Sequence, residues 1–373
     1  MKRGFSVSDI RLQRMAQVLV RYSLDIKKDE RLAILTGPGA TPLVREVVRE
    51  AIQAGGYPET FVTLPGVQEI ILKEGSHEQL SYIPAAQRMI FEEYETMLQL
   101  LAQDNTKELS GIDPARMAVT QRARGNLTET YMRRTAEGTF RWLIAMFPSN
   151  AYAQDANMSL SDFEDFVYRA CFLDDENPVA RWEELSKQQE RLVQWLNGKH
   201  TVHLRGQDTD LTFSIAGRIF INSDGHFNLP DGEFFTGPVE DSANGYIRYS
   251  FPASFAGRSV EDVRLRFESG VVVEAHAAQG QDYLEQMLSI DEGARRLGEF
   301  AFGNNRCVDR CTRNVLFDEK MGGTVHLALG KSIPQTLGVN QSALHWDMVC
   351  DLRTSSEIRV DGELFCKDGQ FVV

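Results

Sequence analysis

The spacing of hydrophobic residues changes near residue 197, and this change limits the folds open to the chain. Before it, segments with apolar residues three and four apart, as on one face of a helix, alternate with short apolar runs that suit buried strands. These runs lie at 32–35, 60–64, 97–101 and 142–147. Strands that alternate with helices predict a mostly parallel sheet covered by helices, so the first part of the chain is expected to be an α/β domain.

Turn and capping residues bracket the expected helices. Ser8 precedes apolar residues at helical spacing and is expected to cap the first helix. Thr41 is expected to cap the second helix, which should end just before Gly55. A charged segment at 182–195 predicts a further helix, and it marks the end of the first domain.

Beyond this helix the pattern changes to short strands of alternating polar and apolar residues, separated by glycine, aspartate and asparagine. The expected strands lie at 201–205, 211–215, 263–267, 271–275, 324–329 and 357–360. One helix is expected near 283–288. The sequence therefore predicts an α/β domain at 1–197, followed at 198–373 by an α+β domain rich in antiparallel strands.

The acidic composition restricts the partners. The chain has 53 Asp and Glu against 40 Lys and Arg, a net charge of -13. Such a chain repels phosphate groups, which argues against nucleic acid and against an anionic membrane as partners. Its five cysteines, an odd number spread along the chain, predict reduced thiols. Because no apolar leader and no run near the ~18 residues of a membrane span occurs, we expect a cytoplasmic protein.

Several signals for other chemistries are weak. Gly37-Pro38-Gly39 follows a strand and opens a helix, but it lacks the third glycine of a dinucleotide-binding fingerprint, so we expect a tight turn. No Gly-x-Ser-x-Gly nucleophile elbow occurs. Cys307 and Cys311 are spaced as metal ligands can be, but no second pair accompanies them, so a four-cysteine zinc site is not expected.

The second half carries a stronger set of candidate ligands. His345 and Asp347 are two residues apart on an expected strand, so they point to the same side and could bind one cation together. His326 lies in another apolar strand, Glu299 in an apolar stretch, and Glu233 after a Pro-Asp-Gly turn. Simpler interpretations remain open. His326 could be a hydrogen-bonded core histidine, Glu299 a surface residue on an edge strand, and Glu233 a solvated residue at a hairpin turn.

Four motifs contain these residues in a fixed order along the chain. They are Pro230-Asp231-Gly232-Glu233, Leu297-Gly298-Glu299, the run at 322–330 and the run at 342–351. Together they resemble the thermophilic aminopeptidase family, the M29 metallopeptidases. The resemblance is dense from about residue 220 to the C-terminus, whereas the first ~200 residues share only the α/β texture.

The resemblance implies a metal-dependent aminopeptidase with two divalent cations, zinc or cobalt, about 3.5–4 Å apart. The metal ligands would be Glu233, Glu299, His326, His345 and Asp347. The resemblance also implies peptide substrates with a free N-terminus, release of the N-terminal residue through a metal-activated water, and a homodimer.

Catalysis also requires a proton acceptor, and Glu299 and Glu319 are the candidates. We favour Glu299 as a ligand that shares this role and expect Glu319 to pair with Lys320. The chain departs from the family pattern at Ile333, where a tyrosine is usual. This departure motivates an alternative, a non-catalytic or altered-activity relative that binds metal or peptide. A non-haem iron oxygenase, suggested by the His-x-Asp spacing, would need a further histidine downstream of His345, and none follows.

Overall fold

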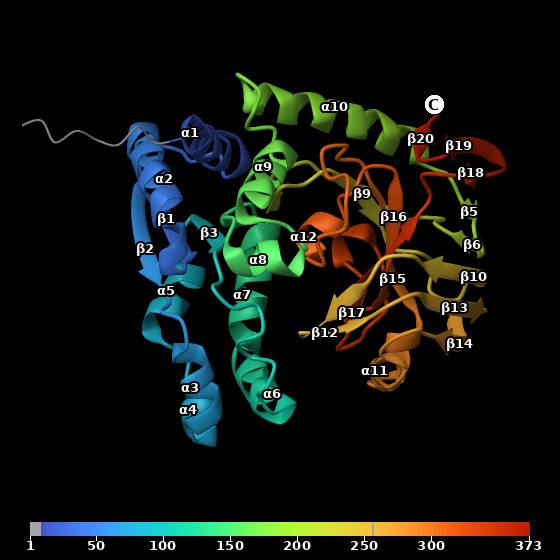
Figure 1. Cartoon of the computed structure of the whole chain (residues 1–373), viewed down its shortest axis with the longest axis horizontal. Coiled ribbons are helices and arrows are strands. Elements are labelled where there is room, and N and C mark those ends of the chain that lie inside the picture. Colours follow the sequence, from blue (N-terminus) through green and yellow to red (C-terminus); the bar gives the residue numbers. More distant parts are fainter. Residues whose placement is uncertain (1–8, 256) are drawn as a thin grey trace, which may run out of the picture. The chain divides into compact units, whose positions relative to one another are not determined.

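The computed structural model describes residues 9–255 and 257–373 (Figure 1). The chain forms two compact units. The first contains the chain up to Arg181 together with Gly225–Pro230, and the second contains Trp182–Asp224 and Asp231–Val373.

The chain passes from the first unit to the second within the long helix α10 (Pro178–Leu196), between Arg181 and Trp182. The sequence placed the domain boundary after this helix, at residue 197. In the structure, Val193 and Leu196 of α10 belong to the hydrophobic core of the second unit, because they pack with strands of that unit. The limits 1–197 and 198–373 stay a prediction. The two compact units differ from these limits in two places: the greater part of α10 belongs to the second unit, and Gly225–Pro230 belongs to the first.

The first unit is built on a parallel five-stranded sheet. Its strands are β1 (Arg31–Thr36), β2 (Tyr57–Val62), β3 (Thr96–Leu101), β4 (Arg141–Met146) and β8 (Asn228–Leu229). Their order is β2-β1-β3-β4-β8, and every neighbouring pair is parallel. Parallel strands need long crossover connections, which helices supply here. The α/β class predicted for this part of the chain is confirmed.

The first helix of this unit precedes β1, and the other helices lie between the strands along the chain. The helices are α1 (Ile10–Gln17), with a π-helical continuation at Val18–Ser23, α2 (Thr41–Ala54), α3 (Val67–Glu74), α4 (His77–Ser81), α5 (Ala85–Glu93), α6 (Pro114–Ala123), α7 (Gly125–Ala136), α8 (Asn150–Asp155) and α9 (Leu160–Ala170). Asp9 caps α1, and Ser8, the cap expected from the sequence, lies outside the described residues. In the described part of the chain, no helix is long and apolar enough to cross a membrane.

The start of α2 differs from the prediction by one residue. Gly37 leads into a short 3₁₀ turn, and α2 then begins at Thr41, with Ala40 in the capping position. The Thr41 hydroxyl donates to the carbonyl oxygen of Pro38 at 2.6 Å, so it does not cap the helix. Gly55 ends the helix as predicted, because its φ of 88° is a left-handed conformation that glycine adopts without strain.

The second unit contains antiparallel sheets, as predicted. The larger sheet has the order β14-β13-β10-β6-β5-β18-β19-β20. Its strands are β5 (Thr201–Gly206), β6 (Thr209–Ser214), β10 (Asn244–Tyr249), β13 (Val263–Glu268), β14 (Val271–His276), β18 (Glu357–Val360), β19 (Glu363–Lys367) and β20 (Gln370–Phe371). A short pair is formed by β11 (Ala253–Phe255) and β12 (Arg258–Val260), and α11 (Gln281–Leu288) is the expected helix. All five cysteines lie in the described part of the chain and are free.

A second, five-stranded sheet has the order β17-β16-β15-β9-β7. Its strands are β7 (Ile221–Ser223), β9 (Glu233–Thr236), β15 (Leu297–Gly303), β16 (Thr324–Gly330) and β17 (His345–Asp351), and the short helix α12 (Val315–Asp318) precedes β16. One face of this sheet packs on the larger sheet, with ring centroids 4.8 Å apart between Phe300 and Phe213. Every residue of β15 and β16 is buried, so polar side chains on these two strands need partners.

Candidate metal centre

One face of the five-stranded sheet gathers the predicted ligands. Side chains alternate between the two faces of a strand, so Glu299 on β15, His326 on β16 and Asp347 on β17 share one face. The register places Ala328 beside both Glu299 and Asp347, and Ala301 beside His326. These small residues leave room between the ligands. The opposite face of the sheet belongs to the hydrophobic core, to which it contributes seven side chains: Phe300, Phe302, Val325, Leu327, Leu329, Trp346 and Met348.

Glu299 reaches this face because of a β-bulge. Leu297 pairs with Leu329 of β16. Glu299 pairs with the adjacent residue Ala328, so Gly298 is an extra residue in β15. In a regular strand Gly298 itself would pair with Ala328, and the side chain of Glu299 would then point to the same side as Leu297, into the hydrophobic core. The bulge therefore decides that this carboxylate faces the other ligands.

Gly298→Ala is expected to destabilise the second unit and to weaken metal binding. An alanine Cβ here would lie 2.4 Å from the carbonyl oxygen of Gly330 and 2.5 Å from that of Lys331, so the backbone must shift. We expect the free energy of unfolding to fall by about 1–3 kcal/mol in a urea titration. Gly111→Ala is the control, because no described atom lies within 4 Å of its Cβ position. Equal stability of the Gly298→Ala variant and the wild type would contradict the role of the bulge.

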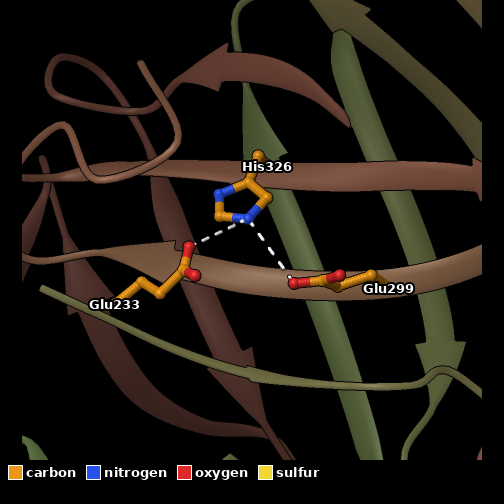
Figure 2. A group of neighbouring side chains, drawn as sticks. All are labelled: Glu233, Glu299 and His326. Carbon is orange, nitrogen blue, oxygen red and sulfur yellow. Dashed lines mark ion pairs between the residues drawn. The ribbon is translucent and has the colours of Figure 1, made fainter. Parts of the chain in front are cut away.

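His326 faces two carboxylates (Figure 2). Its Nε2 atom lies 3.2 Å from Oε2 of Glu233 and 3.7 Å from Oε1 of Glu299. Glu233 begins β9 and Glu299 lies on β15, and the two carboxylates approach the ring from different sides. All three residues are buried, where an isolated charge is costly. They form a first group that could hold a cation.

His345 forms a second group on the same glutamate. Its Nε2 atom lies 3.2 Å from Oε2 of Glu299 and 3.6 Å from Oδ2 of Asp347. Its Nδ1 atom donates to the carbonyl oxygen of Lys331 at 2.7 Å, which orients the ring and leaves Nε2 as the ligand atom. Glu299 thus presents one oxygen to each histidine and connects the two groups.

The donor atoms of this cluster fit divalent cations. Three groups have ligand atoms within 4.8 Å of one another: Glu233, Glu299 and His326; Glu299, His345 and Asp347; Glu319, His326 and Asp347. Glu233 Oε2, Asp347 Oδ1 and both ring nitrogens of His326 are buried and find no hydrogen-bond partner among the described residues. Buried polar atoms are rarely left in this state, and imidazole and carboxylate together are typical ligands of zinc and related cations.

The simpler interpretations of three residues are wrong. Glu233 is buried at the start of β9, so it is not a solvated residue of a hairpin turn. Glu299 is buried on an inner strand, so it is not a surface residue of an edge strand. His326 lacks a hydrogen-bond partner in the described part of the chain, so it is not a satisfied core histidine. All five residues predicted as ligands, together with Glu319, lie in one cluster.

Burial and mutual contact shift the pKa values of the cluster in the metal-free chain. Burial opposes a charge on His326, but the surrounding carboxylates, Glu233 first among them, outweigh this effect and raise its pKa to about 9. Burial likewise opposes a charge on His345, and Asp347 with Glu299 raises its pKa to about 10. Burial disfavours ionised Glu299, but the nearby charges of His326 and His345 outweigh this effect and lower its pKa to about 2. Near neutral pH, both histidines therefore carry protons that a bound cation must displace.

The apparent affinity for divalent cations is expected to increase with pH. Below pH 9 both His326 and His345 are protonated in the metal-free chain, and each must lose its proton to become a ligand. Each displaced proton changes the apparent Kd by about tenfold per pH unit. Titration calorimetry between pH 6 and pH 9, in buffers of different ionisation enthalpy, should detect release of up to two protons. An affinity that does not depend on pH would contradict the assignment of these histidines as ligands.

Lys320 is a member of the cluster that the sequence did not indicate as part of the site. Its side chain is fully buried, and Nζ lies 2.6 Å from Oε1 of Glu233 and 2.5 Å from Oε1 of Glu319. The predicted pairing of Glu319 with Lys320 is confirmed, but the contact with Glu233 joins residues 87 positions apart. The available signal was a lysine close to apolar residues, shortly after Leu316 and Phe317 and directly before Met321.

Comparison with known proteins identifies the family. The family model described as thermophilic metalloprotease (M29) matches residues 8–371. The chain belongs to the M29 metalloprotease family. It is 27% identical to aminopeptidase T of Thermus thermophilus, and the alignment covers 94% of each protein. It is 27% identical to aminopeptidase 2 of Geobacillus stearothermophilus, over 96% of this chain and 95% of that protein.

Comparison with a solved structure supports the fold. The structure of wild-type AmpT from Thermus thermophilus matches with a TM-score of 0.85 and 25% sequence identity, over 97% of this chain and 99% of that chain. The match extends through the first unit, where the sequence motifs were sparse. The chain is therefore an M29 peptidase, a hydrolase that depends on divalent metal, and its fold is the predicted succession of an α/β part and an antiparallel part.

Proposed function

We propose that this M29 peptidase is an aminopeptidase that removes the N-terminal residue of peptides with two divalent cations, zinc or cobalt. The proposal depends above all on Glu299, which joins two groups of ligand atoms by presenting one oxygen to each histidine. The similar proteins are named as aminopeptidases and align over nearly their full length. We propose as metal ligands Glu233, Glu299, His326, His345 and Asp347.

The charge of the cluster supports two cations. Five carboxylates have side chains that are at most 15% exposed: Asp231, Glu233, Glu299, Glu319 and Asp347. Lys320 supplies one positive charge, and the histidines are neutral when they bind metal. Four negative charges remain in a buried setting, where unpaired charge is costly. Two divalent cations balance this charge.

The residues of the cluster have different roles in the proposed reaction. When bound, the cations act as Lewis acids that activate a water molecule and polarise the scissile carbonyl group. Both oxygens of Glu299 face histidines, so we assign this residue as a ligand. Glu319 has one oxygen on Lys320 and lies beside His326 and Asp347, so we assign it as the main acceptor of the water proton and its donor to the leaving amine.

The alternatives receive less support. The departure at Ile333 is the only reason to consider a relative without catalysis. Against it, the cluster contains a complete set of candidate ligands and a candidate proton acceptor. The iron-oxygenase interpretation fails because the chain belongs to a peptidase family. We further propose that the protein is a homodimer, as the resemblance implies. Its free cysteines suit the cytoplasm, a reducing compartment.

One experiment tests the proposed function. We expect the purified protein to bind two equivalents of zinc or cobalt by elemental analysis and to hydrolyse aminoacyl anilides and short peptides. EDTA should abolish hydrolysis, and metal should restore it. The matched substrate is the same peptide with an acetylated N-terminus, which should not be cleaved. Equal cleavage of both peptides would exclude an aminopeptidase, and a single equivalent of metal at full activity would exclude the two-metal site.

A further inference from the structure

Lys320 is a buried cation that contacts three carboxylates. Its side chain has no exposed surface, and Nζ lies 2.6 Å from Glu233, 2.5 Å from Glu319 and 3.9 Å from Asp231. An ammonium group has three donors and no lone pair, so Lys320 cannot itself bind a metal. Its charge and donors are directed to the carboxylates instead.

The backbone around Lys320 is held in place by neighbouring segments. Its amide donates to the carbonyl oxygen of Phe317 at 2.9 Å, which ends the turn after α12. Its carbonyl oxygen accepts from the amide of Asn305 at 3.0 Å, and the Asn305 side chain donates to the carbonyl oxygen of Asp231 at 2.9 Å. The segment with Lys320 is thereby joined to the segment that precedes Glu233.

This arrangement determines which oxygens face the ligands. Lys320 binds Oε1 of Glu233, and the other oxygen, Oε2, lies 3.2 Å from Nε2 of His326. Lys320 also binds Oε1 of Glu319, whose carboxylate is close to His326 and Asp347. Charge-assisted hydrogen bonds of this kind are strong and directional. Without the ammonium group, both carboxylates would repel each other and could rotate.

We propose that Lys320 is a positioning residue of the metal centre. It fixes Glu233 and Glu319 so that each directs one oxygen to the cluster. Its positive charge also balances the one carboxylate charge that two divalent cations leave over. The inference rests on the proposed function, because the cations are part of it. Partners that orient metal ligands typically change metal affinity by about 10–100-fold when they are mutated.

The test compares Lys320→Met, which keeps the length but removes the charge, with Lys320→Arg, which keeps the charge. Lys367→Met is the control, because Lys367 is an exposed residue of β19 in the same unit. Zinc affinity and stoichiometry are measured by competition with a chelating dye, and circular dichroism verifies the fold. Kinetics with an aminoacyl anilide then separate kcat from KM.

We expect Lys320→Met to bind zinc about 10–100-fold more weakly and to lose kcat by a similar factor, with KM changed less than about threefold. Lys320→Arg should recover much of the zinc affinity, and Lys367→Met should match the wild type. A folded Lys320→Met protein with wild-type zinc affinity would overturn the proposal. So would a failure of both Lys320 variants to fold, which would make the residue structural. Fewer than two cations in the wild type would instead refute the proposed function.

Discussion

Glu299→Gln is expected to lower kcat/KM by about 10³-fold or more, because two cations together supply several kcal/mol of transition-state stabilisation. Glu299 contacts both His326 and His345, so the loss of its charge affects both groups of ligands. Glutamine has nearly the same volume, and its amide can still hydrogen-bond the histidines, so the second unit should fold. Elemental analysis should find fewer than two cations, and an anilide assay should give the loss of activity.

The control for this variant is Glu363→Gln. Glu363 is 63% exposed on β19 and pairs only with Lys199 among the described residues, at 3.2 Å, a contact that contributes little to stability. The activity of the Glu363→Gln variant should stay within about twofold of the wild type. If Glu299→Gln retained two cations and full activity, the bridging role of Glu299 would be refuted, and with it the central argument for two linked metal sites.

Removal of the metal is expected to lower the unfolding temperature of the protein as well as its activity. The metal-free cluster has five buried carboxyl groups against three positive charges even when both histidines are protonated. Cations that bind there stabilise the folded state by mass action. At a free concentration 1,000 times the Kd, each site contributes about 4.1 kcal/mol. Calorimetry of the protein with EDTA, and again after addition of two equivalents of zinc, should detect a large and reversible shift.

Glu299→Gln provides the control for this measurement, because a variant with an impaired site should respond less to zinc than the wild type. A thermogram of the wild type that is the same with EDTA and with zinc would contradict the proposal. It would mean that the buried carboxylates are compensated by protons alone, with His326 and His345 remaining charged.

Local patterns were sufficient for several features of the second unit. The two-residue strand period placed His345 and Asp347 on one face. In the structure, Nε2 of His345 lies 3.6 Å from Oδ2 of Asp347. The apolar surroundings of His326 and Glu299 indicated burial, and both residues are buried. The helix cap at Thr41 was wrong because a 3₁₀ turn precedes the helix, and capping depends on the exact residue at which a helix begins.

Other features depend on contacts between distant residues. No local pattern reveals that Gly298 is an extra residue of β15, because the bulge exists only relative to the register of β16. That register also directs the side chain of Glu299 toward the other candidate ligands and away from the hydrophobic core. Lys320 was expected only beside its neighbour Glu319, since its contact with Glu233 requires β9 to lie next to the segment after α12.

The sequence by itself determined the alternation of strands and helices in the first unit, the antiparallel strands of the second, and the residues able to bind metal. These follow from side-chain chemistry and from periodicities of two and 3.6 residues, which act over a few positions. The tertiary structure alone decided that Glu299 lies between the two histidines and that Lys320 holds Glu233 and Glu319. The reason is that strand pairing and burial bring together residues from 233 to 347, and only the packed sheet defines their distances.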